Sequence, residues 1–207
     1  MQPGSLLFHN WQESHYNIKP EGFTRGFHIE MEPRWFADSD LDLHHLQGSI
    51  SIAHPDIKLL MYQIFRESKI EDNITDLSIQ TLLTDAFSRL NRIRQNSGAK
   101  PNWVSTLDEI LNEEFAENLT LAYLSAAANI HPVHLSRDFS KYFHCNLGDY
   151  IRKIRVEKAI ALLSGQKIPL AEIAYRCGFF DQSHMIRCFK AWNGQNPSAF
   201  RKMLQHF

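Results

Sequence analysis

Two short stretches of the chain pair a polar face with an apolar face at helical spacing. Their apolar members recur four residues apart, as Leu135 and Phe139 in one stretch and Met185 and Phe189 in the other. On the polar side, an arginine can bind guanine through two hydrogen bonds, and a glutamine can bind adenine in the same bidentate way. Such helices can hold a core with one face and contact base edges with the other. The candidate base-reading residues are Val133, Ser136, Arg137, Gln182, Ser183 and Arg187.

The two stretches are copies of one pattern. "HLSRDFSKYF", which starts at His134, aligns with "HMIRCFKAWN", which starts at His184, at an offset of 50 residues. Before each copy a turn follows a shorter helical pattern, and Asn129 and Gly178 fall at the same place in that turn. Asn and Gly are the residue types that most readily adopt left-handed backbone angles. The repeat therefore predicts two helix-turn-helix units, at about 121–143 and 170–193. Either unit alone would be interpreted as an ordinary helical hairpin with a solvated face.

Charge is distributed unevenly along the chain. Residues 119–207 carry 12 Lys and Arg against 5 Asp and Glu, a net charge of +7. The preceding 118 residues carry 10 Lys and Arg against 18 Asp and Glu, a net charge of −8. This division is typical of a basic module that binds a polyanion and is joined to an acidic regulatory or assembly module, although chance variation gives the same division.

A long helical pattern separates the two copies. About 17 helical residues would span about 25 Å, which suits a strut holding two recognition helices near the ~34 Å separation of successive major grooves. The apolar stripe of this segment consists of Tyr150, Ile151, Ile154, Ala159, Leu162 and Leu163. Outside the stripe lie Arg152, Lys153, Arg155 and Lys158, which face either DNA phosphates or solvent.

The basic region resembles a known family. "LTLAYLSAAANIHPVHLSRDFSKYF" and "IPLAEIAYRCGFFDQSHMIRCFKAWNGQNPSAFR" are similar to the DNA-binding domain of the AraC/XylS family of bacterial transcriptional regulators. The resemblance implies two helix-turn-helix units joined by a long helix, bound to double-stranded promoter DNA, with no catalytic residue. It places the six residues named above at base-reading positions. The chain departs from the family pattern at His131 and Phe180, where a Ser-like helix cap is usual, and at His144 and Asn193, where a glycine and an aromatic residue are usual.

The acidic region begins with strand-like patterns and continues with helical ones. "PGSLLFHNWQESHYN" and the alternating "GFTRGFHIEMEPRWF" resemble the closing strands of a cupin-like effector domain. Helical periodicity follows at 59–65 and 78–93, and the apolar stripe of the second helix packs either within its own domain or in a homodimer. The fold class predicted is mainly α, with a partial cupin-like segment and two dimerisation helices at 1–95, a linker at 96–102, and an all-α DNA-binding domain at 103–207.

Several alternatives to an effector-controlled regulator stay open. Histidines on the strand-like segments allow a cupin-type metal-binding or catalytic protein with a helical tail; they are His9, His15, His28, His44 and His45, with Glu13 and Glu30 nearby. Because these residues lack the spacing of a metal motif, we predict no metal site, no cofactor and no enzyme activity. The opening strands of a cupin-like domain are missing from the sequence, so an effector-blind, truncated regulator is a second alternative. Contact with RNA polymerase, binding of a small-molecule effector, and activation or repression are left undecided.

Cysteine usage and hydropathy bear on the compartment. Cys145, Cys177 and Cys188 are odd in number and lack metal-motif spacing. They suit reduced, buried thiols in a cytoplasmic protein better than a disulfide framework. The apolar runs of the chain fall short of the roughly 18–20 residues that cross a bilayer, so no membrane segment is predicted.

Overall fold

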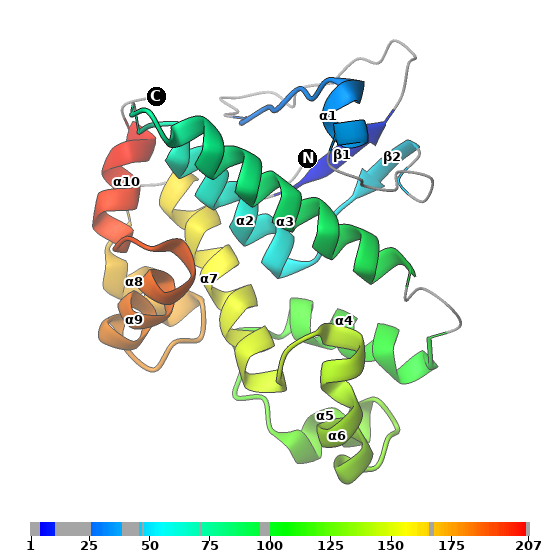
Figure 1. Cartoon of the computed structure of the whole chain (residues 1–207). Helices are drawn as coiled ribbons and strands as arrows, with labels where there is room; N and C mark the ends of the chain where they lie inside the picture. Colours follow the sequence, from blue (N-terminus) through cyan, green and yellow to red (C-terminus); the bar gives the residue numbers. More distant parts are fainter. Residues whose placement is uncertain are drawn as a thin grey trace. The chain divides into compact units, whose positions relative to one another are not determined.

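The chain divides into two compact units, Met1–Asn96 and Ser97–Phe207 (Figure 1). A computed structural model describes residues 5–10, 26–38, 46, 48–70, 72–95, 100–165 and 168–205. The boundary between the units falls inside the polar segment 94–102. Each unit has its own hydrophobic cluster.

The first unit combines a small sheet with two long helices. In chain order its elements are β1 (Leu7–Asn10), α1 (Pro33–Asp38), β2 (Gly48–Ser51), α2 (Pro55–Glu67) and α3 (Thr75–Gln95). β1 and β2 are antiparallel, with Leu7 opposite Ser51 and Asn10 opposite Gly48. α2 and α3 pack against each other, and their inward residues form one cluster with the sheet and α1. That cluster consists of Phe36, Leu46, Ile50, Ile52, Ile57, Ile64, Leu83, Phe87 and Leu90.

The helices of this unit were predicted correctly and one strand was not. α2 and α3 contain the predicted stretches 59–65 and 78–93 and extend beyond both. The alternating segment that ends at Met31 forms no strand over residues 26–32; residues before 26 lie outside the described part. Ile29 and Met31 still pack against the core, because an extended chain can bury alternate side chains without pairing in a ladder. The partner of β1 is instead β2, a four-residue strand too short to give a clear alternation.

The second unit is helical throughout its described residues, which confirms the mainly-α prediction. Its elements are α4 (Asn102–Glu113), α5 (Leu121–Ala127), α6 (Pro132–Phe143), α7 (Leu147–Gly165), α8 (Leu170–Arg176), α9 (Gln182–Asn193) and α10 (Pro197–Gln205). α7 is the long helix, and it contacts α4 and α6 as well as α8, α9 and α10 (Figure 1). None of the helices in the described ranges combines the length and apolar character needed to cross a bilayer.

Side-chain caps mark where several of these helices begin. Thr120 accepts a hydrogen bond from the backbone N–H of Tyr123 at 3.1 Å before α5. Asn146 accepts one from Asp149 at 2.8 Å before α7. Asn196 does the same for Ala199 at 2.8 Å before α10. Each cap satisfies one of the N–H groups that the first helical turn leaves without a partner.

Candidate nucleic-acid interface

The turns of the two helix-turn-helix units have the same backbone structure. Asn129 and Gly178 both lie in the left-handed region, with φ of 49° and 71°. The next residue of each turn makes an equivalent backbone hydrogen bond, from Ile130 N–H to Ser125 O and from Phe179 N–H to Ala174 O, each at 2.9 Å. The internal repeat read from the sequence is therefore a structural repeat, and the predicted roles of Asn129 and Gly178 in the turns are confirmed.

Each second helix starts with a side-chain cap. At the start of α6, His131 accepts a hydrogen bond from the backbone N–H of Val133 through Nδ1 at 3.3 Å. At the start of α9, Asp181 accepts one from the backbone N–H of His184 at 2.6 Å. The expectation that Phe180 stands at the cap of α9 is wrong, because Asp181 is the residue that matches His131 at the offset of 50. Phe180 remains in the turn, with 92 % of its surface exposed.

The other two departures from the family pattern are accommodated. His144 ends α6 in the left-handed region with φ of 59°, where Gly194 ends α9 with φ of 73°. Histidine is among the non-glycine residues that adopt this region more readily than most. Asn193, which stands in place of an aromatic residue, is the last residue of α9 and is buried.

The inner faces of α6 and α9 are fully buried, as predicted. Leu135, Phe139, Met185 and Phe189 each expose 1 % of their surface or less. Phe143 of α6 meets Tyr150 of α7 edge to face with ring centroids 4.9 Å apart, and Phe189 of α9 meets Phe200 of α10 edge to face at 5.6 Å. These aromatic contacts hold each second helix on its own unit, so its opposite face is directed away from the core.

The outer faces carry the six candidate residues, all of them exposed: Val133, Ser136 and Arg137 on α6, and Gln182, Ser183 and Arg187 on α9. The two arginines occupy equivalent positions but differ in their surroundings. Arg137 donates hydrogen bonds from Nε and Nη2 to the two carboxylate oxygens of Asp138, both at 2.9 Å. Arg187 has no carboxylate at ion-pair distance among the described residues.

The electrostatics of the two helices follow from these contacts. Hydrogen bonding to Arg137 lowers the pKa of Asp138, and the same bond raises the pKa of Arg137. On α9, burial and the nearby charge of Arg187 lower the pKa of His184. The neutral form of His184 is thereby favoured, which leaves Arg187 to carry the positive charge of this part of α9.

The basic residues of α7 are engaged within the protein. Arg152 donates to Asp149 at 2.7 Å, and Lys158 lies 5.4 Å above the ring of Phe115. Arg155 is half-buried and donates from Nε to Phe115 O at 2.7 Å and from Nη2 to Glu117 O at 2.9 Å. Phosphates or solvent were the partners expected for these side chains, and the contact of Arg155 was not predicted. Helical periodicity holds no signal for it, because its partners lie 38 and 40 residues earlier.

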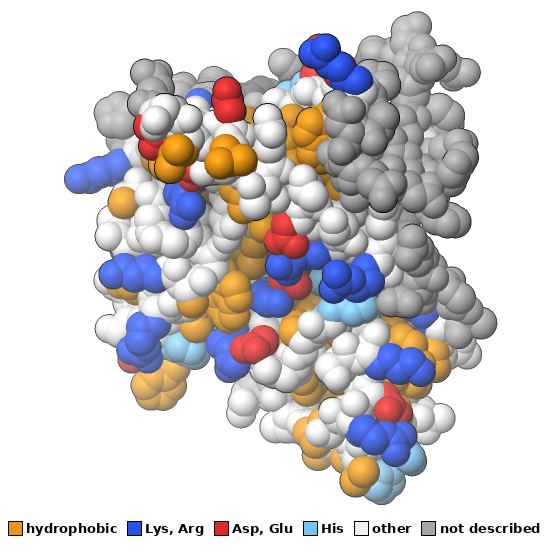
Figure 2. All heavy atoms as spheres, in the orientation of Figure 1, with side chains coloured by type: hydrophobic (Ala, Val, Ile, Leu, Met, Phe, Trp, Pro, Cys, Tyr) orange, Lys and Arg blue, Asp and Glu red, His pale blue; other side chains and the backbone are white. Residues whose placement is uncertain are grey.

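Figure 2 shows one face of the molecule, on which Lys and Arg side chains outnumber Asp and Glu around the helices of the second unit. Two aromatic side chains in this unit are unusually exposed: Tyr175 on α8 at 79 % and Phe180 at 92 %. Sequence reasoning did not single out either as a surface residue. For Phe180 the sequence did hold a signal, which is its place one residue before the cap of α9. A residue there lies on neither helix, so no helix face carries its side chain into the core.

Two histidines of the strand-like segments lie within the described residues and have partners. His9 Nδ1 lies 2.7 Å from Ser49 Oγ across the sheet, and His28 Nε2 lies 3.5 Å from Glu30 Oε1. Within the described ranges, no three His, Cys, Asp or Glu side chains come together as a metal site. Glu13, His15, His44 and His45 lie outside those ranges.

All three cysteines are free thiols, and Cys177 and Cys188 are buried as predicted. Burial raises the pKa of Cys177 to about 12 and raises that of Cys188. Neither thiol is therefore suited to act as a nucleophile or a redox sensor near neutral pH.

Known proteins have sequences similar to this chain. Residues 124–203 match a family model described as a helix-turn-helix domain. The Escherichia coli protein described as an uncharacterized HTH-type transcriptional regulator, YijO, is 26 % identical over 151 residues, which cover 72 % of this chain and 53 % of YijO. The Bacillus subtilis bifunctional transcriptional activator/DNA repair enzyme AdaA is 33 % identical over 101 residues, which cover 49 % of this chain and 48 % of AdaA.

One solved structure among those similar is the C-terminal domain of the response regulator yesN from Fusobacterium nucleatum. It is 30 % identical, has a TM-score of 0.46, and covers 49 % of this chain and 99 % of that domain. The chain spans about half the length of the curated relatives it matches.

The region matched to the family model contains α6 to α9 entire, with both turns and both capped second helices. The two family stretches recognised in the sequence fold into the two helix-turn-helix units, with α7 between them. The two curated relatives are described as an HTH-type transcriptional regulator and as a bifunctional transcriptional activator/DNA repair enzyme. Over residues 124–203 this chain therefore carries a helix-turn-helix domain, in the same region whose sequence resembles the DNA-binding domain of the AraC family.

Proposed function

We propose that the chain is a sequence-specific DNA-binding transcription regulator that places α6 and α9 in successive major grooves of promoter DNA. The observation that carries this proposal is the repeated division of faces: each second helix buries its apolar side completely and presents a polar set outward. α7, the helix between the two helix-turn-helix units, has 19 residues and spans about 28 Å at 1.5 Å per residue, a length suited to neighbouring grooves.

The roles of the six exposed residues follow from their chemistry. Arg187 has the two donors for bidentate contact with guanine, and Gln182 has the donor and the acceptor for bidentate contact with adenine. Val133 offers a methyl surface for thymine. Arg137 must exchange its carboxylate partner Asp138 for DNA, so its net contribution is smaller than that of Arg187. Contacts from other Lys and Arg side chains to phosphates supply affinity without sequence preference.

The proposal makes the chain a regulator and not an enzyme. AdaA is named as a DNA repair enzyme as well as an activator, but only 48 % of its length aligns with this chain. We therefore do not propose the repair activity of AdaA for this chain. A regulator of promoters acts where the promoters are, which places it in the cytoplasm of a bacterium.

The direct test is selection of DNA by the full-length chain. The chain is mixed with a pool of random duplexes at two salt concentrations, and the bound DNA is sequenced. We expect enrichment of a bipartite site whose half-sites lie about one helical turn apart. Binding that is lost steeply with salt and enriches no sequence would leave only a basic surface, and the proposed function would be wrong.

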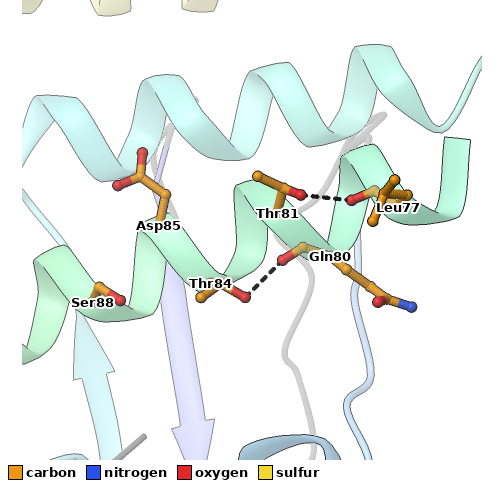
Figure 3. A pocket seen from close by; sticks show the side chains of 6 residues that line it. All are labelled: Leu77, Gln80, Thr81, Thr84, Asp85 and Ser88. Carbon is orange, nitrogen blue, oxygen red and sulfur yellow. Dashed lines mark hydrogen bonds between the residues drawn. The ribbon is translucent and has the colours of Figure 1, made fainter. Parts of the chain in front are cut away.

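We also propose that the first unit forms a homodimer through α3 and the turn before it. Ile70, Ile74 and Leu77 in this region are 42 %, 54 % and 65 % exposed. Figure 3 shows the face of α3 that continues from Leu77, a shallow hollow with Thr81, Thr84 and Ser88 along the helix.

The threonines on this face suit close helix packing. Thr81 Oγ1 donates to Leu77 O at 2.8 Å and Thr84 Oγ1 donates to Gln80 O at 2.9 Å. Because both hydroxyls bond within the helix, their methyl groups are left to face outward. Small apolar groups continuing from an exposed leucine are compatible with a partner helix on this face. The apolar stripe that the sequence offered for dimerisation packs instead within its own unit.

A further inference from the structure

A short segment of the second unit connects its two helix-turn-helix halves. Residues Phe115–Glu117, named the brace here, join α4 to α5 and so belong by sequence to the first half. Their backbone contacts side chains and backbone from elsewhere. Arg155 of α7 donates to Phe115 O and Glu117 O at 2.7 and 2.9 Å. Ala116 lies against Gly178, the turn residue of the second half.

The contact at Gly178 leaves no room for a side chain. A Cβ placed on Gly178 would come within 2.4 Å of Ala116 O and 2.6 Å of Ala116 Cα. Both neighbours are backbone atoms of the brace, so a rotamer change could not relieve the overlap.

Comparison of the two turns separates this contact from backbone strain. Asn129 holds the equivalent position in the first half at φ 49°, carries a side chain and is exposed. The turn conformation by itself therefore accepts a residue with a Cβ. Glycine is required at position 178 because the brace occupies the space that a side chain would take.

The surroundings of the brace restrict its movement further. Lys158 of α7 lies over the ring of Phe115, and Phe115 packs against the core of the first half. Cys177, next to Gly178, is fully buried in the second half. Phe115 thus attaches the brace to the core of the first half, and Cys177 attaches the turn at Gly178 to the core of the second half. Arg155 lies on α7, which runs between these two cores.

We propose that the brace fixes α6 and α9 relative to each other, with Arg155 and Gly178 as the residues that position it. A single helix between two units can bend and twist, whereas a second connection beside it removes that freedom. The consequence for DNA, which rests on the proposed function, is that the chain accepts one spacing between half-sites and rejects others. Arg155 is then a specificity-determining residue that need not touch DNA.

The first test measures the distance between α6 and α9 without DNA. Spin labels are attached to the full-length chain at S140C and A191C, which are exposed positions on the two helices, in a Cys145→Ser background. Pulsed electron spin resonance then gives the distribution of label distances. We expect a narrow distribution in the parent chain and a broader one in Arg155→Met and in Gly178→Asn. Arg155→Met keeps the apolar stem and removes the donors, and Gly178→Asn introduces a Cβ with a residue that the first turn already uses.

Two further variants complete this test. Arg176→Met removes an exposed arginine whose partner, Glu172, lies one turn away on the same helix, α8, and should leave the distribution narrow. Arg155→Lys, which can still donate to one carbonyl, should give an intermediate width. If circular dichroism shows that the variants are folded and their distributions match that of the parent, the brace does not fix the two helices and the proposal is overturned.

The second test measures spacing preference on DNA. The half-sites found by selection are re-synthesised with one base pair added or removed between them. We expect the parent to lose at least about tenfold in affinity and Arg155→Met to lose clearly less. An unchanged spacing preference in Arg155→Met would refute the role in specificity. Failure of the parent to select any bipartite site would refute the proposed function instead, and the label distances would still decide whether the brace is rigid.

Discussion

At the scale of single residues, the two equivalent arginines show how the same sequence position acquires different properties. Arg137 and Arg187 both lie on the outer face of a second helix, 50 residues apart. The residue that follows is Asp138 in one copy and Cys188 in the other, so only Arg137 has a carboxylate beside it. An exposed ion pair of this kind must be broken before the guanidinium can bind a base. Arg187 is therefore the better candidate for a strong base contact.

We predict that Arg187→Ala costs about 1–3 kcal/mol of binding free energy and relaxes preference at one base pair. The loss arises because the base that Arg187 contacts would be left without a hydrogen-bond donor from the protein. Arg176→Ala is the matched control, since it removes the same charge from α8 of the same unit, where Arg176 pairs with Glu172 at 2.7 Å. Binding of each variant to the selected site and to single-base variants of that site is the measurement. Equal losses on target and random DNA for Arg187→Ala would contradict its assigned role.

The buried cysteines give a second residue-scale prediction. With the pKa of Cys177 raised to about 12 by burial, almost none of this thiol is ionised at pH 8. We expect a disulfide reagent such as Ellman's reagent to react first with the half-buried Cys145. Cys177 and Cys188 should react only when the second unit unfolds, because the thiolate is the reactive form. Rapid reaction of three thiols in the folded chain would show that this core is open.

At the scale of elements, helix starts are set by single side chains. Asn146 accepts the N–H of Asp149 and donates to its carboxylate at 2.7 Å, while Arg152 binds the same carboxylate from one turn further on. The start of α7 is thus held by a cap and an ion pair together. Because α7 lies between the two recognition helices, fraying at this end would loosen the first of them.

We predict that Asn146→Ala lowers the free energy of unfolding of the second unit by about 1 kcal/mol, the usual value of a lost N-terminal cap. Ser140→Ala, at an exposed site within α6, is the control and should change stability little. Urea unfolding of the full-length chain followed by circular dichroism measures both. Equal midpoints for Asn146→Ala and the parent would mean that water replaces the cap without loss.

At the scale of the whole molecule, charge and assembly separate the two units. The acidic first unit carries exposed apolar side chains at Ile70, Ile74 and Leu77, and the basic second unit carries the candidate DNA surface. A regulator built this way would associate through one unit and bind DNA through the other. A dimer would then present four recognition helices to DNA, which raises apparent affinity for paired sites.

The dimer prediction can be tested with one substitution. We expect Leu77→Glu to weaken self-association of the full-length chain at least about tenfold, because the interface would have to bury an unpaired charge. Val133→Glu is the control: Val133 is 63 % exposed, close to the 65 % of Leu77, but it lies in the other unit. Sedimentation equilibrium over a range of concentrations measures both. A parent chain that stays monomeric, or a Leu77→Glu variant that still dimerises, would rule out this interface.

Local sequence patterns account for the features that depend on neighbours a few residues apart. The helical period of Leu135 with Phe139, and of Met185 with Phe189, settles which face is buried, and Asn129 and Gly178 mark the turns through their backbone preferences. The pairing of β1 with β2 and the contact of Arg155 with the brace are visible only in the tertiary structure. These contacts join residues about 40 positions apart, and no local spacing encodes which distant backbone will come to lie beside a side chain. Gly178 depends on both local and distant neighbours. Its residue type marks the turn in the sequence, whereas the position of Ala116 in the tertiary structure explains why no residue with a side chain fits there.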